Sequence, residues 1–420
     1  MQGKPKIHGF NIFYGWYILA ASFLILFFTT GARFTIGVVF KPLMTEFGWD
    51  RGLISLAFFL NMTIYAFSLI IIGRAYDRYG PKWVIMISAI FLSVGFMSLS
   101  LVESSWQFFI FYGILAALGM GGTTVPLFAA LMSKWFERGR GLAVSMGLAG
   151  SCMGQFILVP AFTALVLRYG WRISYFYIGL VMLVVIMTLA LVVIKGDPHD
   201  LGLEPWGHEN RVDVRKDKDR KVIDINSRDL GLMDAMKTYS FWLFGTVMFV
   251  CGSGDFLVTT HLIPMVTDYN IPATSAGNML AWLGLMSLPG ILIAGPLSDR
   301  IGNKIPIALT FLMRFALFVF ILKFQGLVSF YVFACAFGFT LLIGKLYGFS
   351  HVGLLSGFIT TIHHLGGGFW AYLGGEIFDR TGSYELAFIL SAIMALVAVL
   401  CTILIKEKRH EVSAPAGAGY

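Results

Sequence analysis

The amino-acid sequence predicts an all-α membrane protein whose twelve transmembrane helices form two pseudo-symmetric six-helix bundles. Three observations support this class: the composition, the length of the apolar runs and an internal repeat. Of the 420 residues, 57% are hydrophobic and 13% are charged, and the mean hydropathy is +0.78, whereas soluble domains are about 25% charged. Apolar runs of about twenty residues match the ~30 Å hydrocarbon core when they are helical. Because lipid offers the backbone no hydrogen-bond partners, such runs must be helices.

The apolar runs divide evenly between the two halves of the chain. The expected spans are 14–39, 52–72, 83–102, 106–132, 142–167 and 172–194 in the first half, and 241–266, 275–296, 305–322, 327–347, 352–377 and 384–405 in the second. The stretch 196–238 is polar and has mixed charges, so we expect a solvated linker there. The predicted organisation is a six-helix bundle over 1–195, a cytoplasmic linker over 196–238, and a second bundle with a short cytoplasmic tail over 239–420.

Basic residues indicate how the chain is oriented in the membrane. Most of the 31 lysines and arginines lie in the termini, the central linker and the loops that share one side of the predicted topology. Since Lys and Arg concentrate in cytoplasmic loops, both termini are expected in the cytoplasm of a multi-pass protein of the cytoplasmic (inner) membrane. The net charge of +8 has the same cause, so we expect no nucleic-acid partner.

An internal repeat relates the two halves. The stretch GRAYDRYGPK at 73–82 interrupts the apolar sequence with four charged side chains, and GPLSDRIGNK at 295–304 repeats its pattern 222 residues later. A second alignment, offset by 212, matches glycines at 141, 154 and 170 to those at 353, 366 and 382. Two copies in the same orientation predict a parallel repeat about an axis along the membrane normal.

Other chemistries find little support in the sequence. The four cysteines lie inside apolar spans without a CxxC pair, which is typical of packing residues. No phosphate-binding loop and no grouping of a nucleophile with a base stands out. We therefore expect neither an enzyme nor a cofactor nor a metal site.

Ionisable residues inside the spans are the candidates for function, because each costs about 3 kcal/mol or more in lipid and usually faces an internal cavity. Arg33 in span one can bind an organic anion with a bidentate guanidinium, or it can snorkel to the outer interface. Asp255 in span seven can carry a proton or pair with an arginine, and we expect Arg33 to be that partner. Arg314 is either structural or a second partner, and His261 is a candidate for gating or capping. These residues all lie within otherwise apolar sequence.

His363 and His364 are the candidates for proton coupling, because imidazole titrates near neutral pH. Adjacent positions on a helix point about 100° apart, so we expect only one of the two to face the cavity.

The motif Gly-x-x-x-Asp-Arg-x-Gly-x-Lys between spans two and three resembles the signature of the major facilitator superfamily. This resemblance implies a cytoplasmic latch that engages in one state and opens in the other, although a plain basic anchor would also explain the charges. The gating candidates are Gly73, Asp77, Arg78, Asp299 and Arg300.

Further stretches are similar to the bacterial branch of the monocarboxylate and oxalate–formate transporters. They are FYGWYIL (13–19), SKWFERGRGLAVSMGLAGSCMGQ (133–155), THLIPMVTDYNI (260–271), FLMRFAL (311–317) and HHLGGGFWAYLGGEIFDRTGSY (363–384). Two departures matter: the arginine that this family often carries in span eight is absent, and Phe34 stands at about the place of the usual span-one lysine, next to Arg33. The anion-binding charge then falls to Arg33, or the substrate is not a simple monocarboxylate.

The resemblance also implies which spans line a central cavity. The expected substrate-binding residues are Arg33, Asn61, Tyr65, Thr123, Thr124, Gln155, Asn278, Trp282 and His364, and the expected proton-coupling residues are Asp255, His363 and His364. For each of the uncharged polar candidates, the alternative role is to pack between helices. The implied function is secondary active transport of a small organic anion, a monocarboxylate, coupled to protons by alternating access, in a monomer. An anion exchanger, an exporter of lipophilic compounds and a transporter-like sensor remain alternatives.

Overall fold

The computed structural model describes residues 13–208, 236–302, 304–340 and 354–405, and it leaves out the side chains of 291, 294–296, 298–300 and 354–356. Over these ranges the chain is helical apart from short connections and one isolated bridge between Phe136 and Trp206. Nine helical stretches among the described residues are long and apolar enough to cross a membrane.

The first half contains six helical spans. Span one is α1 (Gly15–Arg33) followed by α2 (Ile36–Phe47), span two is α3 (Arg51–Tyr79), and span three is α4 (Pro81–Ser98) with a 3₁₀ turn η1 (Leu99–Leu101). Span four consists of α5 (Ser105–Phe108), the π-helical η2 (Phe109–Ala116), α6 (Ala117–Gly121) and α7 (Val125–Trp135). Spans five and six are α8 (Arg140–Tyr169) and α9 (Trp171–Val192).

The second half repeats this order. It comprises α11 (Tyr239–Asp268), α12 (Ala273–Ile301), α13 (Lys304–Lys323), α14 (Leu327–Thr340), α16 (Leu354–Thr381) and α17 (Glu385–Leu404). The later part of the predicted span 327–347 and the start of 352–377 lie outside the described residues.

The duplication is visible in the turns between spans. Gly80 and Gly302 have φ of 80° and 75°, and Gly170 and Gly382 have φ of 80° and 72°. A side chain at a positive φ is strained, so glycine is required at these four turns. Both alignments of the repeat therefore pair residues with the same backbone conformation.

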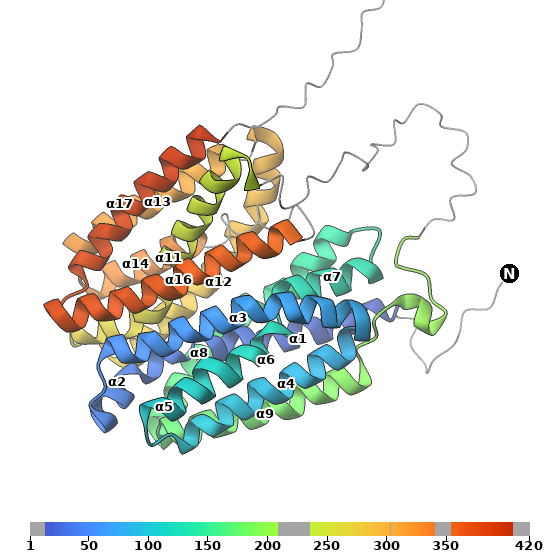
Figure 1. Ribbon diagram of the computed structural model, residues 1–420, viewed down its shortest axis with the longest axis horizontal. Helices are drawn as coiled ribbons and strands as arrows, with labels where there is room; N and C mark the ends of the chain where they lie inside the picture. Colours follow the sequence, from blue (N-terminus) through green and yellow to red (C-terminus); the bar gives the residue numbers. More distant parts are fainter. Residues whose placement is uncertain (1–12, 209–235, 303, 341–353, 406–420) are drawn as a thin grey trace, which may run out of the picture.

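The two halves lie side by side along two helix pairs, α3 with α16 and α8 with α12 (Figure 1). Residues 51–65 of α3 meet residues 364–379 of α16, and residues 152–163 of α8 meet residues 277–287 of α12. These segments are the parts of the four helices near the turns at Gly48 and Gly170. We call this end of the molecule the closed end.

Glycines allow α1 and α8 to approach each other closely. A Cβ at Gly150 would overlap the carbonyl oxygen of Phe23, and one at Gly154 would overlap that of Phe27. Close backbone approach at small residues is a principal way in which transmembrane helices pack. This contact fixes the position of the last turn of α1, which carries Arg33.

The predicted linker begins as a docked segment and is not solvated throughout. After α9, the short 3₁₀ helix η3 (Pro198–Leu201) leads to Trp206, whose backbone N–H donates to the carbonyl of Trp135 at 2.9 Å. The carbonyl of Trp206 accepts from the N–H groups of Glu137 and Arg138. The rest of the linker, 209–235, lies outside the described residues.

Candidate functional site

A cavity of about 210 Å³ lies between the two halves, whereas a water molecule needs roughly 10–15 Å³ by the same measure. Its lining comes from α1, α3, α8 and span four of the first half and from α11, α12 and α16 of the second. The lining residues are Thr29, Thr30, Arg33, Phe34, Tyr65, Met120, Thr123, Thr124, Val125, Pro126, Leu148, Ser151, Cys152, Gln155, Met248, Asp255, Phe256, Thr259, Ser287, Thr360, His363 and His364.

A larger pocket, about 350 Å³, lies at the closed end but is lined only by residues 265–388 of the second half. Transport by alternating access requires a site that both halves share. The cavity between the halves is therefore the candidate substrate site.

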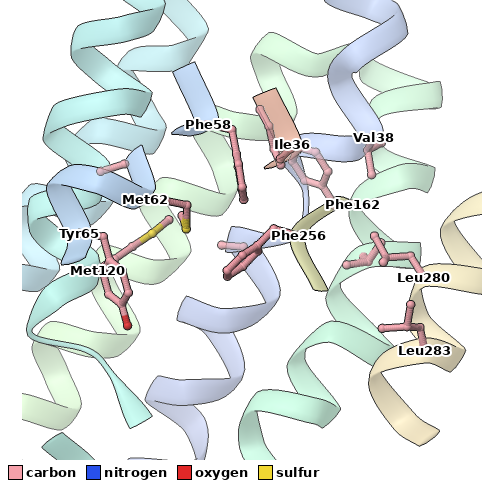
Figure 2. Packing of buried hydrophobic residues seen from close by; sticks show 14 of the residues in the cluster. Ile36, Val38, Phe58, Met62, Tyr65, Met120, Phe162, Phe256, Leu280 and Leu283 are labelled. Atoms are coloured by element: carbon pink, nitrogen blue, oxygen red, sulfur yellow. The ribbon is translucent and has the colours of Figure 1, made fainter. Parts of the chain in front are cut away.

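Arg33 ends α1 at the wall of the cavity. Its guanidinium carbon lies 4.9 Å from the ring centroid of Phe256 and 5.2 Å from that of Tyr65, and Nη2 is 2.8 Å from the sulfur of Met62. Figure 2 shows Met62, Tyr65 and Phe256 around the same part of the interior. Among the described residues, no carboxylate lies within 4.0 Å of this guanidinium. The positive charge of Arg33 is thus stabilised by cation–π contacts and a thioether, and a bound anion would stabilise it more strongly.

Asp255 pairs with Arg314, contrary to the expected pairing with Arg33. One carboxylate oxygen is 2.6 Å from Nη2 of Arg314, and both side chains are buried. The same guanidinium donates to the hydroxyl of Thr340 at 3.1 Å and to the carbonyl of Cys251 at 3.1 Å. The expected pairing is wrong for this conformation because α13 places Arg314 against α11, within the second half, where sequence order alone suggested a peripheral role.

His363 lies beside the other carboxylate oxygen of Asp255, with Nε2 at 3.8 Å. Ligand atoms of Cys251, Asp255 and His363 fall within 4.8 Å of one another, which is a spacing suited to a metal ion. However, the Arg314 guanidinium already neutralises this carboxylate and would repel a cation. Electrostatics therefore disfavour a metal ion at this cluster.

His364 also lines the cavity, so the expectation that only one of the adjacent histidines faces it is wrong. Its Nδ1 donates to the carbonyl of Thr360 at 2.7 Å, and its ring packs edge-on against Tyr65 at 4.8 Å. Phe256 contacts both imidazoles, each at 5.7 Å between ring centroids. Tyr65 and Phe256 thus connect Arg33 with the histidine pair.

Three residues expected at the cavity wall lie elsewhere. Asn61 is buried and donates from Nδ2 to the carbonyl of Tyr112 at 2.5 Å, which ties α3 to η2. Asn278 is exposed, and Trp282 is 39% exposed and packs against Phe156. A helix with apolar residues all round gives little sign of which face is internal, so residue type alone misplaced these side chains.

Thr123, Thr124 and Gln155 do line the cavity. Gln155 donates from Nε2 to the carbonyl of Leu280 at 2.8 Å and so bridges the halves. Sequence reasoning missed the smaller polar residues Thr29, Thr30, Ser151, Cys152, Thr259, Thr360 and Ser287, and the apolar Phe256. A serine or threonine inside an apolar span carries little signal, since its hydroxyl can bond to its own helix.

Side chains from both halves meet at the closed end. Arg51 donates to Asp268 at 2.8 Å and to the hydroxyl of Tyr384 at 2.9 Å. The hydroxyl of Tyr384 in turn donates to Nδ1 of His261 at 2.8 Å. His261 then donates from Nε2 to the carbonyl of Ala371 at 2.7 Å, a tautomer assigned from the network.

Asp379 of α16 completes this contact. Its two carboxylate oxygens accept from the backbone N–H groups of Arg51 at 3.1 Å and Gly52 at 2.5 Å, at the N-terminus of α3. A helix N-terminus carries partial positive charge and unpaired amides, so the carboxylate caps α3 across the interface. We call Arg51, Asp268, Asp379, Tyr384 and His261 the closed-end clasp.

The charged motif at the opposite end makes no comparable contact in the described part of the chain. Asp77 and Arg78 are exposed, and a Cβ at Gly73 would meet no atom within 4 Å. Asp299 and Arg300 lie within α12, but their side chains are outside the described residues.

Comparison with known proteins establishes the family. The family model described as Major Facilitator Superfamily matches residues 22–251 and 242–419. The chain belongs to the major facilitator superfamily. Its members are transporters and not enzymes, and this chain is accordingly a multi-pass secondary transporter.

Solved structures confirm the fold class. A bacterial homologue of the human lysosomal transporter Spinster, in an inward-facing and occupied conformation, superposes with a TM-score of 0.70 at 15% identity, covering 94% of this chain and 97% of that one. A mutant of the nucleoside transporter NupG gives a TM-score of 0.69 at 13% identity, covering 94% of this chain and all of that one. At these identities the likeness concerns the fold alone.

Relatives by sequence are distant. The chain is 25% identical to YcxA, an uncharacterised transporter of this superfamily from Bacillus subtilis, over 94% of this chain and 98% of that protein. It is 24% identical to human monocarboxylate transporter 7, over 94% of this chain and 86% of that protein, and 24% identical to rat monocarboxylate transporter 4, over 96% and 86%.

Proposed function

We propose that this transporter moves a small organic anion, a monocarboxylate, together with a proton. The observation that carries the proposal is the Arg33 guanidinium at the cavity wall, with aromatic rings and a thioether as its contacts and no carboxylate within 4.0 Å among the described residues. A planar carboxylate can accept two parallel hydrogen bonds from a guanidinium. The distant relatives named as monocarboxylate transporters support the same class.

Proton coupling is assigned to Asp255, His363 and His364. Asp255 and the two imidazoles line the cavity, and the carboxylate lies 2.6 Å from Arg314 and 3.8 Å from His363. A proton on either imidazole would offset the negative charge of the acid. Transport of one acid with one proton would then move no net charge.

The conformation fits an inward-facing state in a cytoplasmic membrane with both termini inside. With that orientation, the closed-end clasp faces outward, and the exposed motif around Asp77 and Arg78 faces the cytoplasm. We assign the alternate closure to this motif and to its repeat at Asp299 and Arg300, with the clasp opening as the motif engages.

The test is uptake into liposomes with the panel lactate, pyruvate, acetate, oxalate and formate, with and without an inward proton gradient. Wild-type protein should accumulate one or more of these acids under the gradient. Arg33→Gln should abolish this uptake, and Arg33→Lys should retain a fraction of it because lysine keeps the charge without the planar fork. Arg168→Gln, at an exposed arginine ending α8, is the matched control.

Each alternative predicts a different result. Uptake that depends on a second acid inside the liposome, and not on the gradient, would identify an exchanger. Efflux of a lipophilic compound that is unaffected by Arg33→Gln would refute the anion proposal.

A further inference from the structure

Span four is broken where it borders the cavity. α6 ends at Gly121, α7 begins at Val125, and Thr124 has an extended backbone with φ −94° and ψ 157°. Pro126 stands in the first turn of α7, where its missing N–H costs no intrahelical hydrogen bond, so it favours the start of a new helix at this point. Gly122 packs against α4, where a Cβ would overlap the hydroxyl of Ser88, and the chain bends there.

The break leaves the N-terminus of α7 at the cavity wall. Thr123, Thr124, Val125 and Pro126 all line the cavity, and no side chain caps the helix. The first N–H groups of a helix lack partners within it and carry partial positive charge. In membrane transporters, half-helix N-termini of this kind point at anionic groups of substrates.

The hydroxyl of Thr124 is a second, independent indication of a ligand. This side chain is only 6% exposed, lines the cavity, and makes no hydrogen bond to the residues that the structure describes. The neighbouring Thr123 differs, because its hydroxyl donates to the carbonyls of Gly119 and Met120 at 3.4 Å. Since this residue lines the cavity, its hydroxyl is available to a polar atom of a ligand.

α7 is directed toward Arg33. Its last residue, Trp135, packs on Tyr14 just before α1, whereas the Thr123 carbonyl just before α7 accepts from Thr29, near the end of α1. The two helices are therefore antiparallel. Since helical N–H groups point toward the N-terminus, those of α7 point toward the end of α1, where Arg33 lies one turn, about 6 Å, beyond Thr29 on the same face.

We propose that the first turn of α7 and the Thr124 hydroxyl bind the substrate carboxylate jointly with Arg33. The Arg33 guanidinium would donate hydrogen bonds to the carboxylate from one side. The Thr124 hydroxyl and the unpaired backbone N–H groups of α7 would donate to it from the other side. This inference rests on the proposed function and refines it. The break in span four makes the first half of the chain the anion-binding half.

The experiment measures binding of the same five acids to the purified full chain by thermal stabilisation. Thr124→Val keeps the shape of the side chain and removes the hydroxyl, so the Kd for each acid that binds should rise about ten-fold or more. Thr124→Ser should stay near wild type. Thr402→Val removes a buried hydroxyl that bonds to its own helix on α17, away from the cavity, and is the matched control.

A double variant tests whether the two groups act on one ligand. If Thr124 and Arg33 bind the same carboxylate, the losses in Arg33→Gln and Thr124→Val should fail to multiply in the combined variant.

The outcomes separate the two proposals. A wild-type Kd in Thr124→Val, together with weakened binding in Arg33→Gln, would overturn this inference and leave the proposed function standing. Equal losses in Thr124→Val and Thr124→Ser would also overturn it, because packing and not the hydroxyl would then be responsible. Absence of binding of every acid to the wild type would overturn both.

Discussion

Removing one member of the buried Asp255–Arg314 pair should destabilise the protein more than removing both. The two groups are 2.6 Å apart, and their side chains are 3% and 1% exposed. Breaking a buried ion pair by deleting one partner costs about 3–5 kcal/mol, whereas replacing both is often nearly neutral.

The structure ranks the two single variants. Asp255→Asn leaves the guanidinium with Thr340 and the carbonyl of Cys251 as acceptors, so its cost should lie near the lower limit, about 3 kcal/mol. Arg314→Gln removes the guanidinium from a buried carboxylate that keeps the Cys251 thiol at 3.9 Å and His363 at 3.8 Å, and its cost should lie near about 5 kcal/mol. The double variant should cost less than either single variant, below about 3 kcal/mol, and so far less than the sum of the two.

The assay is equilibrium unfolding in mixed micelles with increasing sodium dodecyl sulfate, followed by tryptophan fluorescence for the wild type, both single variants and the double variant. Thr310→Val, which removes a buried hydroxyl one turn away on α13, controls for general loss of packing. Costs that simply add would refute the reasoning, since they would mean that the two charges do not depend on each other.

Three further predictions concern other parts of the molecule. Asp379→Asn removes the charge that caps α3, so the closed-end clasp should weaken by about 1 kcal/mol. Thiol reagents on that side should then label Cys152 in the cavity lining faster; unchanged labelling would contradict the capping role. Gly154→Leu should prevent α1 from reaching α8 and abolish monodisperse expression, which size-exclusion chromatography would show. Finally, the hydrogen bond to Asp197 raises the pKa of His199 in the folded protein. The contribution of this exposed pair to folding stability is therefore fully present below the pKa of the unfolded chain, near about 6.5, and is lost as the pH rises through the raised pKa of the folded protein. The melting temperatures of wild type and His199→Gln should differ most near about pH 5–6 and converge above about pH 8.

Much of the fold could be predicted because the bilayer restricts the possibilities. An apolar run of sufficient length in lipid must be helical. The repeated charged turn predicted the duplication, and Gly80 and Gly302 share a backbone conformation in the structure. Breaks within spans were harder to predict. Pro126 interrupts a helix, whereas Pro160 and Pro264 lie inside continuous helices.

The candidate site could be predicted in part. Arg33, Asp255 and the histidine pair are rare charges in an apolar sequence, and all of them line one cavity. Their partners could not be predicted, because the rotation of α11 against α13 decides whether Asp255 meets Arg33 or Arg314. The clasp residue Asp379 gave no signal either, since an acidic residue near a helix end is ordinary in sequence.

The duplication did not distribute charge evenly across the cavity. The first half contributes a lone guanidinium to the wall, and the second contributes a carboxylate and two imidazoles, each half being a separate body of packed helices. In the proposed symport one half binds the acid and the other binds the proton, so their mutual attraction would draw the halves together only when both are bound. An empty carrier, or one loaded with the acid alone, would lack this attraction. The unequal charges of the two repeated halves would thus fix the ratio of acid to proton in the proposed symport.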